Sequence, residues 1–183
     1  LRASGIKAPV LILSPTPSWA LDTALDNKLD ISVSSLKELS DVDSRAQKQN
    51  CQARVHLKVD TGMHRLGISP SDVSSALDQI ESAKALKLVS VFSHLACASD
   101  LSAVQMQDRI FKDVVALASK DAQIFFHLAS SEAARSFDFT HYDMVRVGLY
   151  LYGLEPNTIS PDLQPALSVR ARINHIGTVP TGQ

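Results

Sequence analysis

The feature that most constrains the fold of this chain is a regular alternation of short apolar runs with longer segments of helical periodicity. The apolar runs that predict buried strands are residues 9–13, 30–33, 53–59, 88–93, 123–127 and 143–147. Helical spacing predicts helices over residues 19–28, from Ser34 or Ser35 to about Gln49, from Ser69-Pro70 onward, over 101–120, and from Ser130-Ser131 onward. Strands that alternate with helices build right-handed βαβ units, so the sequence predicts an α/β domain with a parallel sheet.

Two folds share this pattern: a doubly wound sheet and part of an eight-stranded (β/α)8 barrel. Polar residues favour the barrel, because Asp60, His94, His127 and Arg146 lie at or just beyond the carboxyl ends of expected strands. Barrel enzymes build their active sites at that end. No dinucleotide or phosphate-loop glycine motif follows any strand, which weakens the doubly wound alternative.

Composition excludes several other classes. The 18 basic and 19 acidic residues leave a net charge of −1, which provides no basic surface for nucleic acid. No apolar run approaches the roughly 20 residues that a membrane-spanning helix needs. The two cysteines, Cys51 and Cys97, have no metal-ligand spacing and are typical of free thiols in a reducing compartment, which predicts a cytoplasmic protein.

The segment from Val55 to Ile68 places a lysine, Lys58, in an otherwise apolar strand. A buried ammonium needs a compensating anion or chemical conversion to one, although an exposed lysine on an edge strand is the simpler alternative. Gly62 and Gly67 allow unusual backbone angles in the loop that follows, and Arg65 between them is either directed into the barrel mouth or solvated.

Three further segments are ambiguous when each is taken alone. His94 ends an apolar strand, where a hydrogen-bonded core residue is more common than a catalyst. His127 precedes Ser130-Ser131, and serines at a helix start either cap the helix or help its amides bind an anion. Arg146, followed by Gly148, belongs either to a buried ion pair or to a ligand site.

Together and in this order, these segments resemble alanine racemase, a pyridoxal-phosphate enzyme of the eight-stranded barrel type. The motif Lys-Val-Asp-Thr-Gly-Met-x-Arg-Leu-Gly from Lys58 is highly specific, and Val-Arg-x-Gly from Val145 supports it. The resemblance runs from Leu1 to about Thr178. It implies a partial (β/α)8 barrel over residues 1–160 that lacks its first strands, and over residues 161–183 a linker with the first strand, near 166–179, of a C-terminal β domain.

The resemblance also implies roles for residues of the first strongly matching segments. Lys58 matches a lysine that is carbamylated in many members, and the carbamate would be an anion able to hold Arg65. Arg65 matches the arginine that contacts the phenolic oxygen of the cofactor and the carboxylate of the substrate. His94 matches a histidine beside the catalytic tyrosine.

Later residues match the cofactor-binding positions of the family. Ser131, with the backbone of Gly148 and Leu149, would bind the phosphate, and Ser130 stands where the family has asparagine. Arg146 matches the arginine at the pyridine nitrogen, and His127 matches the histidine that supports it.

Two other positions depart from the family, since His64 replaces a usual glycine and Val147 a frequent proline. The lysine that binds the cofactor covalently and the tyrosine that acts as second base match no residue here, and Tyr142, Tyr150 and Tyr152 correspond to neither. We therefore expect this chain alone to be inactive.

The resemblance predicts an isomerase that interconverts L- and D-alanine for peptidoglycan precursors, as a homodimer with alanine as its small-molecule substrate. Three alternatives remain. They are a racemase of the same fold with a broader amino-acid range, a non-catalytic barrel that binds pyridoxal phosphate, and a metal-dependent hydrolase using Asp60, His94 and His127.

Overall fold

The computed structural model describes residues 1–118, 123–155 and 162–182, which form two compact units, 1–146 and 147–183. The strands are Leu11–Ile12 (β1), Asp30–Val33 (β2), Ala53–Lys58 (β3), Leu86–Phe92 (β4) and Phe125–His127 (β5). The helices are Leu21–Asp26 (α1), Leu36–Lys48 (α2), Val73–Ser82 (α3), Leu101–Ala118 (α4) and Ser131–Ser136 (α5).

The five strands form one parallel sheet in the order β1-β2-β3-β4-β5, so each strand pairs with the next along the chain. A doubly wound sheet reverses its strand order at a switch point, whereas a barrel adds every new strand on the same side. The observed order never reverses. The predicted partial (β/α)8 barrel is therefore confirmed.

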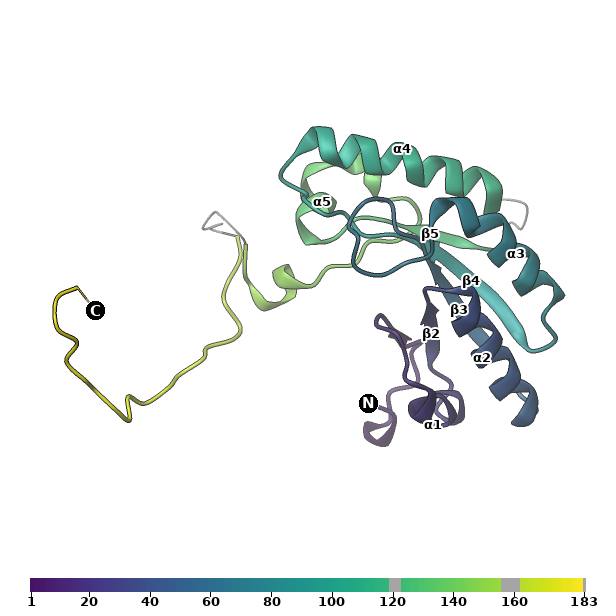
Figure 1. Ribbon diagram of the computed structural model, residues 1–183, viewed down its shortest axis with the longest axis horizontal. Coiled ribbons are helices and arrows are strands. Elements are labelled where there is room, and N and C mark those ends of the chain that lie inside the picture. Colours follow the sequence, from purple (N-terminus) through teal and green to yellow (C-terminus); the bar gives the residue numbers. More distant parts are fainter. Residues whose placement is uncertain (119–122, 156–161, 183) are drawn as a thin grey trace. The chain divides into compact units, whose positions relative to one another are not determined.

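The helices between the strands cover one face of this sheet, and Figure 1 shows α2, α3 and α4 following one another along it. The main apolar core lies between these helices and the sheet. Its strand residues include Ile31, Val55, Leu57, Val91 and Phe126. Burial of these side chains is the main force that holds the helices on the sheet.

The opposite face of the strands, which is the inner face of the half-barrel, is polar. Side chains alternate between the two faces of a strand, so residues two apart share a face. Register places His56 beside Ser90 and Lys58 beside Phe92, and Phe92 in turn beside His127. These five side chains are buried, yet Phe92 alone among them is hydrophobic. Buried polar side chains on the inner face of a barrel are typical of a catalytic or ligand-binding site.

Local sequence explains where the predicted helices begin. Ser35 caps α2 by accepting a hydrogen bond from the Glu38 amide at 3.1 Å, and the Glu38 carboxylate accepts from the Ser34 amide at 2.6 Å. This pair is a variant of the capping box, in which the glutamate accepts from the amide before the N-cap residue and not from the N-cap amide itself. Pro70 opens the turn that leads into α3, as its fixed φ predicts. The expected end of α4 at Lys120 lies outside the described residues.

The expected sixth strand at 143–147 is wrong. This segment follows β5 through only two backbone bonds, from the Asp143 amide to Phe126 and from the Arg146 amide to Ala129. The Phe126 amide, which would donate to a strand partner, donates instead to the Asp143 carboxylate at 2.7 Å. Val145 and Val147 are exposed, so no apolar contact favours a longer pairing. A single bridge between Ser130 and Arg146 remains.

The second unit contains a 3-10 turn at Leu149–Tyr152. Residues 166–179, expected to be extended, pair with no strand among the described residues. Residues 156–161, where the expected barrel passes into the expected linker, lie outside the described residues. The C-terminal β domain therefore stays a prediction.

Candidate active site

The carboxyl ends of β3, β4 and β5 bring the predicted site residues of the first unit together. Lys58 is the last residue of β3 and His127 the last of β5, while His94 follows β4 by two residues. Because the strands are parallel and in register, these ends meet at one edge of the half-barrel. The structure thus gathers residues that are far apart in the sequence.

Arg146 is the centre of this cluster. Its guanidinium donates to the carbonyl oxygens of Ser93 at 2.6 Å, Leu128 at 3.1 Å and His127 at 3.2 Å. It also lies 2.6 Å from the Nδ1 of His127 and 3.2 Å from the Nδ1 of His94. No carboxylate among the described residues pairs with it, so the predicted alternative of a buried ion pair is wrong.

Both histidines of the cluster are neutral. Burial lowers the pKa of His127 to about 3, and the positive charge of Arg146 adds to the effect. Burial, together with Arg146 and Lys58, lowers the pKa of His94 to about 4. A neutral imidazole has one nitrogen that accepts, and in each case Nδ1 faces the Arg146 guanidinium.

Lys58 is 5% exposed, so the alternative of a solvated edge lysine is wrong. Its Nζ lies 4.8 Å from the centre of the Phe92 ring, and no hydrogen bond or ion pair joins it to another described residue. Burial, then the charges of Arg146 and Arg65, lowers the pKa of Lys58 to about 8, against a weaker opposite effect of Asp60. Lys58 is therefore a buried amine without a partner anion among the described residues, which is the situation for which the sequence predicted a compensating anion or chemical conversion.

The loop after β3 is held by Asp60. The Asp60 carboxylate accepts from the amides of Gly62, Met63 and His64 at 2.9, 3.0 and 3.1 Å. His64 has a φ of 55°, in the left-handed region that glycine adopts at little cost, and His64 is the residue that replaces a usual glycine of the family. The loop presents Arg65 as an exposed side chain whose charge still acts on Lys58 and His94.

Ser130 and Ser131 lie where β5 passes into α5. Ser130 is the N-cap residue of α5 and forms an isolated β-bridge with Arg146. The start of the helix therefore lies beside Arg146. Ser131 is buried. Gly148 and Leu149 belong to the second unit, and their expected role at a phosphate site stays a prediction.

Two residues of the site were missed by the sequence reasoning. The Phe92 ring lies under the cations, since the Arg146 guanidinium carbon is 5.2 Å from its centre, and it stacks on His127 at 4.7 Å. Gln107 of α4, which is 1% exposed, accepts from the Ala96 amide and donates to Thr61 and to the His94 carbonyl. The sequence does indicate Gln107 in one way, because a glutamine on the apolar face of a helix needs hydrogen-bond partners in the interior.

The geometry does not favour the metal-hydrolase alternative. Three backbone amides occupy Oδ1 of Asp60, and both ring nitrogens of His127 are engaged, by Ser90 and by Arg146. Within the described ranges, no group of three or more histidine, cysteine or acidic side chains is placed to hold a metal ion.

Consecutive parallel strands with Lys58, Arg65, Arg146 and two neutral imidazoles at their carboxyl ends define an enzyme of the (β/α)8-barrel class, whose active sites lie at that end. The family profile of the alanine racemase N-terminal domain matches residues 1–156. The chain belongs to this family.

Relatives and solved structures agree with the profile. An alanine racemase of Thermobifida fusca is 37% identical over 183 residues, which is 94% of this chain and 49% of that protein. One from Synechocystis is 37% identical over 193 residues, 100% of this chain and 51% of that protein. The structure of alanine racemase from Corynebacterium glutamicum superposes with a TM-score of 0.78 at 29% identity, over 90% of this chain and 48% of that one. The chain thus spans about half the length of the curated relatives it matches.

Proposed function

We propose that the complete protein carrying this chain is an alanine racemase, which interconverts L- and D-alanine with pyridoxal phosphate. The observation that carries the proposal is the gathering of Arg65 and Arg146 at the carboxyl ends of the strands, where no carboxylate of the described residues forms an ion pair with either guanidinium. This excess of positive charge fits a phosphorylated, anionic ring. When bound, the cofactor supplies the electron-withdrawing ring that makes the α-proton of an amino acid acidic.

Each residue of the cluster has a proposed task. Arg146 would donate to the pyridine nitrogen, and because a guanidinium is a permanent donor it would not give up a proton there. Arg65 would orient the carboxylate of the substrate through charge-assisted hydrogen bonds. Ser131 and the backbone of Gly148 and Leu149 would hold the phosphate, with Ser130 as an additional donor.

The two remaining residues of the cluster would keep its geometry. His127 supports Arg146, and its pKa of about 3 keeps it an acceptor throughout the neutral range. His94 lies on the other side of the same guanidinium and would place the proton-transferring group of the complete protein. Both bases needed for racemisation would come from parts of the protein beyond the residues of this chain.

We also propose a homodimer in the cytoplasm that supplies D-alanine for peptidoglycan. Free Cys51 and Cys97 are consistent with a reducing compartment. No helix in the described part of the chain is long and apolar enough to cross a membrane.

The direct test is racemisation by the purified complete protein. We expect D-alanine to form from L-alanine in the presence of pyridoxal phosphate, and an absorption band to report the bound cofactor. Parallel assays with serine, lysine and arginine decide between a strict alanine racemase and one of broader range. Bound cofactor with no D-amino acid formed would contradict the proposal and favour a non-catalytic barrel.

Lys58 is expected to carry a carbamate. With a pKa of about 8, roughly a tenth of the amine is neutral at pH 7, far more than for an ordinary lysine, and the neutral amine reacts with CO2. The resulting anion would resolve the unpaired burial of Lys58 and attract Arg65. We expect a ¹³C carbamate signal after growth in labelled bicarbonate, lost in Lys58→Ala but kept in Lys87→Ala, an exposed lysine on the neighbouring strand. The same signal in both variants, or in neither, would contradict this.

A further inference from the structure

A line of hydrogen-bonded side chains crosses the inner face of the half-barrel from one end of the strands to the other. Asp30 Oδ2 lies 3.0 Å from Nε2 of His56, whose Nδ1 is 2.6 Å from Ser90 Oγ. Ser90 Oγ lies 2.9 Å from Nε2 of His127, and His127 Nδ1 lies 2.6 Å from Arg146. The first three contacts join β2 to β3, β3 to β4 and β4 to β5, and the last joins β5 to Arg146, so the line connects β2 to the candidate active site.

The groups at the two ends of the line, the Asp30 carboxylate and the Arg146 guanidinium, determine which atom donates in every hydrogen bond between them. The Arg146 guanidinium only donates, so His127 Nδ1 accepts and its Nε2 carries the hydrogen, which Ser90 accepts. The Ser90 hydroxyl hydrogen is then free to donate to His56 Nδ1. At the other end, the Asp30 carboxylate only accepts, so His56 donates from Nε2. One arrangement of hydrogens therefore satisfies all five groups.

A different placement of hydrogens is costly because the middle of the line is buried. His56 is 4% exposed, and Ser90 and His127 are 0% exposed. If Nδ1 of His56 carried a hydrogen, Ser90 Oγ would face donors on both sides and its own hydrogen would lack an acceptor in the line. A buried donor without an acceptor has lost its hydrogen bonds to water and makes none in the protein, which costs free energy of folding. The interior thus enforces the single arrangement.

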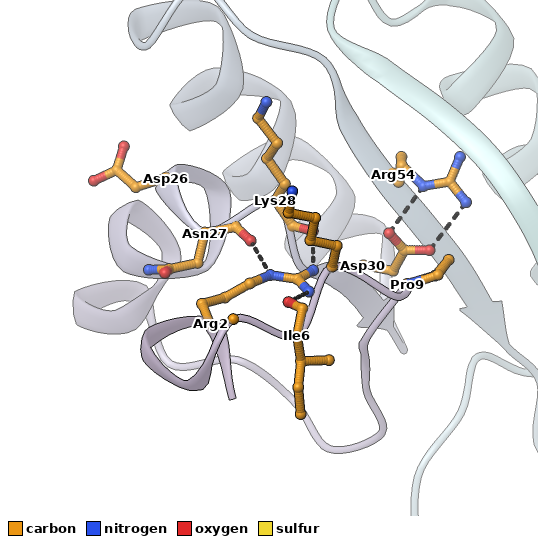
Figure 2. A pocket seen from close by; sticks show the side chains of 10 residues that line it. Arg2, Ile6, Pro9, Asp26, Asn27, Lys28, Asp30 and Arg54 are labelled. Atoms are coloured by element: carbon orange, nitrogen blue, oxygen red, sulfur yellow. Dashed lines mark hydrogen bonds and ion pairs between the residues drawn. The ribbon is translucent and has the colours of Figure 1, made fainter.

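The outer end of the line is held firmly. Arg54 donates to both oxygens of Asp30, at 2.9 and 3.1 Å, as Figure 2 shows. Burial alone would raise the pKa of Asp30, but the hydrogen bonds from His56 and Arg54 keep it below its ordinary value. Asp30 and Arg54 line a cavity of about 590 Å³ near the amino ends of β2 and β3. The acceptor end is therefore a fixed carboxylate at the opposite end of the strands from Arg146.

We propose that Asp30, His56 and Ser90 are positioning residues for Arg146, which they orient by holding His127 in the tautomer that accepts from the guanidinium. The inference rests on the proposed function for the role of Arg146 at the cofactor ring. It adds three residues that lie outside the cluster at the carboxyl ends of the strands. They act through His127 and touch no reacting atom.

Ser90→Ala in the complete protein is the test, because it cuts the line in its middle and removes only one oxygen. Its matched control is Ser32→Ala: Ser32 is also a buried serine of the sheet, and its hydroxyl makes no hydrogen bond with the described residues. The primary readout is the ¹⁵N signals of the histidine rings, which report which nitrogen carries hydrogen. The second readout is kcat and KM for racemisation.

We expect wild-type and Ser32→Ala protein to show His56 and His127 as single Nε2-protonated tautomers. Ser90→Ala should mix the tautomers of His127 and lower kcat by about tenfold with a smaller change in KM. Ser90→Thr, which restores a hydroxyl, should recover both readouts. Should Ser90→Ala unfold, Ser90→Cys keeps the side-chain size with a weaker hydrogen bond and should show the same changes to a smaller extent.

Ring signals and kcat in Ser90→Ala equal to those in Ser32→Ala would overturn the inference. A failure of the proposed function would look different, because wild-type protein would then not racemise alanine. In that case the ring signals alone decide whether the line holds His127 in one tautomer, since they depend on the fold and not on turnover.

Discussion

Replacing Arg146 with alanine is expected to cause the largest loss of activity among single substitutions in this chain. The guanidinium is the donor common to three carbonyl oxygens and two imidazoles, so its removal takes apart the cluster as well as the proposed contact with the pyridine nitrogen. Loss of one preorganised donor in an active site costs about 100-fold to 1000-fold in kcat. We expect a loss of at least that size, measured as racemisation by the complete protein.

The same substitution should lower stability, because the carbonyls of Ser93 and Leu128 lose their donor, whereas the His127 carbonyl still accepts from the Ser93 amide at 3.2 Å. Each buried acceptor left without a partner costs about 1–3 kcal/mol. Denaturant unfolding of Arg146→Ala should therefore show a loss of several kcal/mol, while Arg109→Ala, an exposed arginine of α4, should show almost none. Arg146→Lys should retain part of the stability but little activity, since an ammonium lacks the planar set of donors. Near wild-type activity in Arg146→Ala would contradict the assigned role.

Gly67→Val is expected to be the most destabilising substitution in the loop that carries Arg65. Gly67 has a φ of 134°, and a Cβ there would lie 2.5 Å from the Asp60 amide nitrogen and 2.7 Å from the Val59 carbonyl carbon. These are backbone atoms, which cannot move aside without breaking the bonds from Asp60 to Ile68 and from Ile68 to Lys58. Backbone strain alone costs on the order of 1–3 kcal/mol, and the overlap adds to it.

Gly5→Val separates these two contributions. Gly5 also has a positive φ, of 80°, but no heavy atom of the described residues lies within 4 Å of the position that a Cβ would take there. We expect thermal unfolding to show a modest loss for Gly5→Val and a loss of more than about 3 kcal/mol for Gly67→Val. Gly67→Val should also raise KM for alanine, because Arg65 loses its fixed loop. Equal effects of the two substitutions would show that the close approach of Gly67 to the Asp60 backbone is unimportant.

The sequence alone determined the barrel class and most elements. Apolar runs placed β2 at Asp30–Val33 with its observed bounds, and the caps at Ser35 and Pro70 placed the starts of two helical segments. These signals are local, because hydrophobic periodicity and capping depend on residues a few positions apart. The same reasoning failed at residues 143–147, where strand formation depends on a neighbour that the pattern cannot show.

Sequence also identified Lys58, Arg65, His94, His127 and Arg146 as the residues of interest, through their charge in apolar surroundings and their order in a family motif. Only the tertiary structure decided their partners. It showed that carbonyl oxygens, and not a carboxylate, hold Arg146, that Phe92 lies beneath the cations, and that Ser90 links two histidines on different strands. Such contacts join residues that are separated by tens of positions and meet only because parallel strands align. Their hydrogen-bond directions follow from the groups at the two ends of the line, and burial, which exists only in the folded chain, makes any other placement of hydrogens costly.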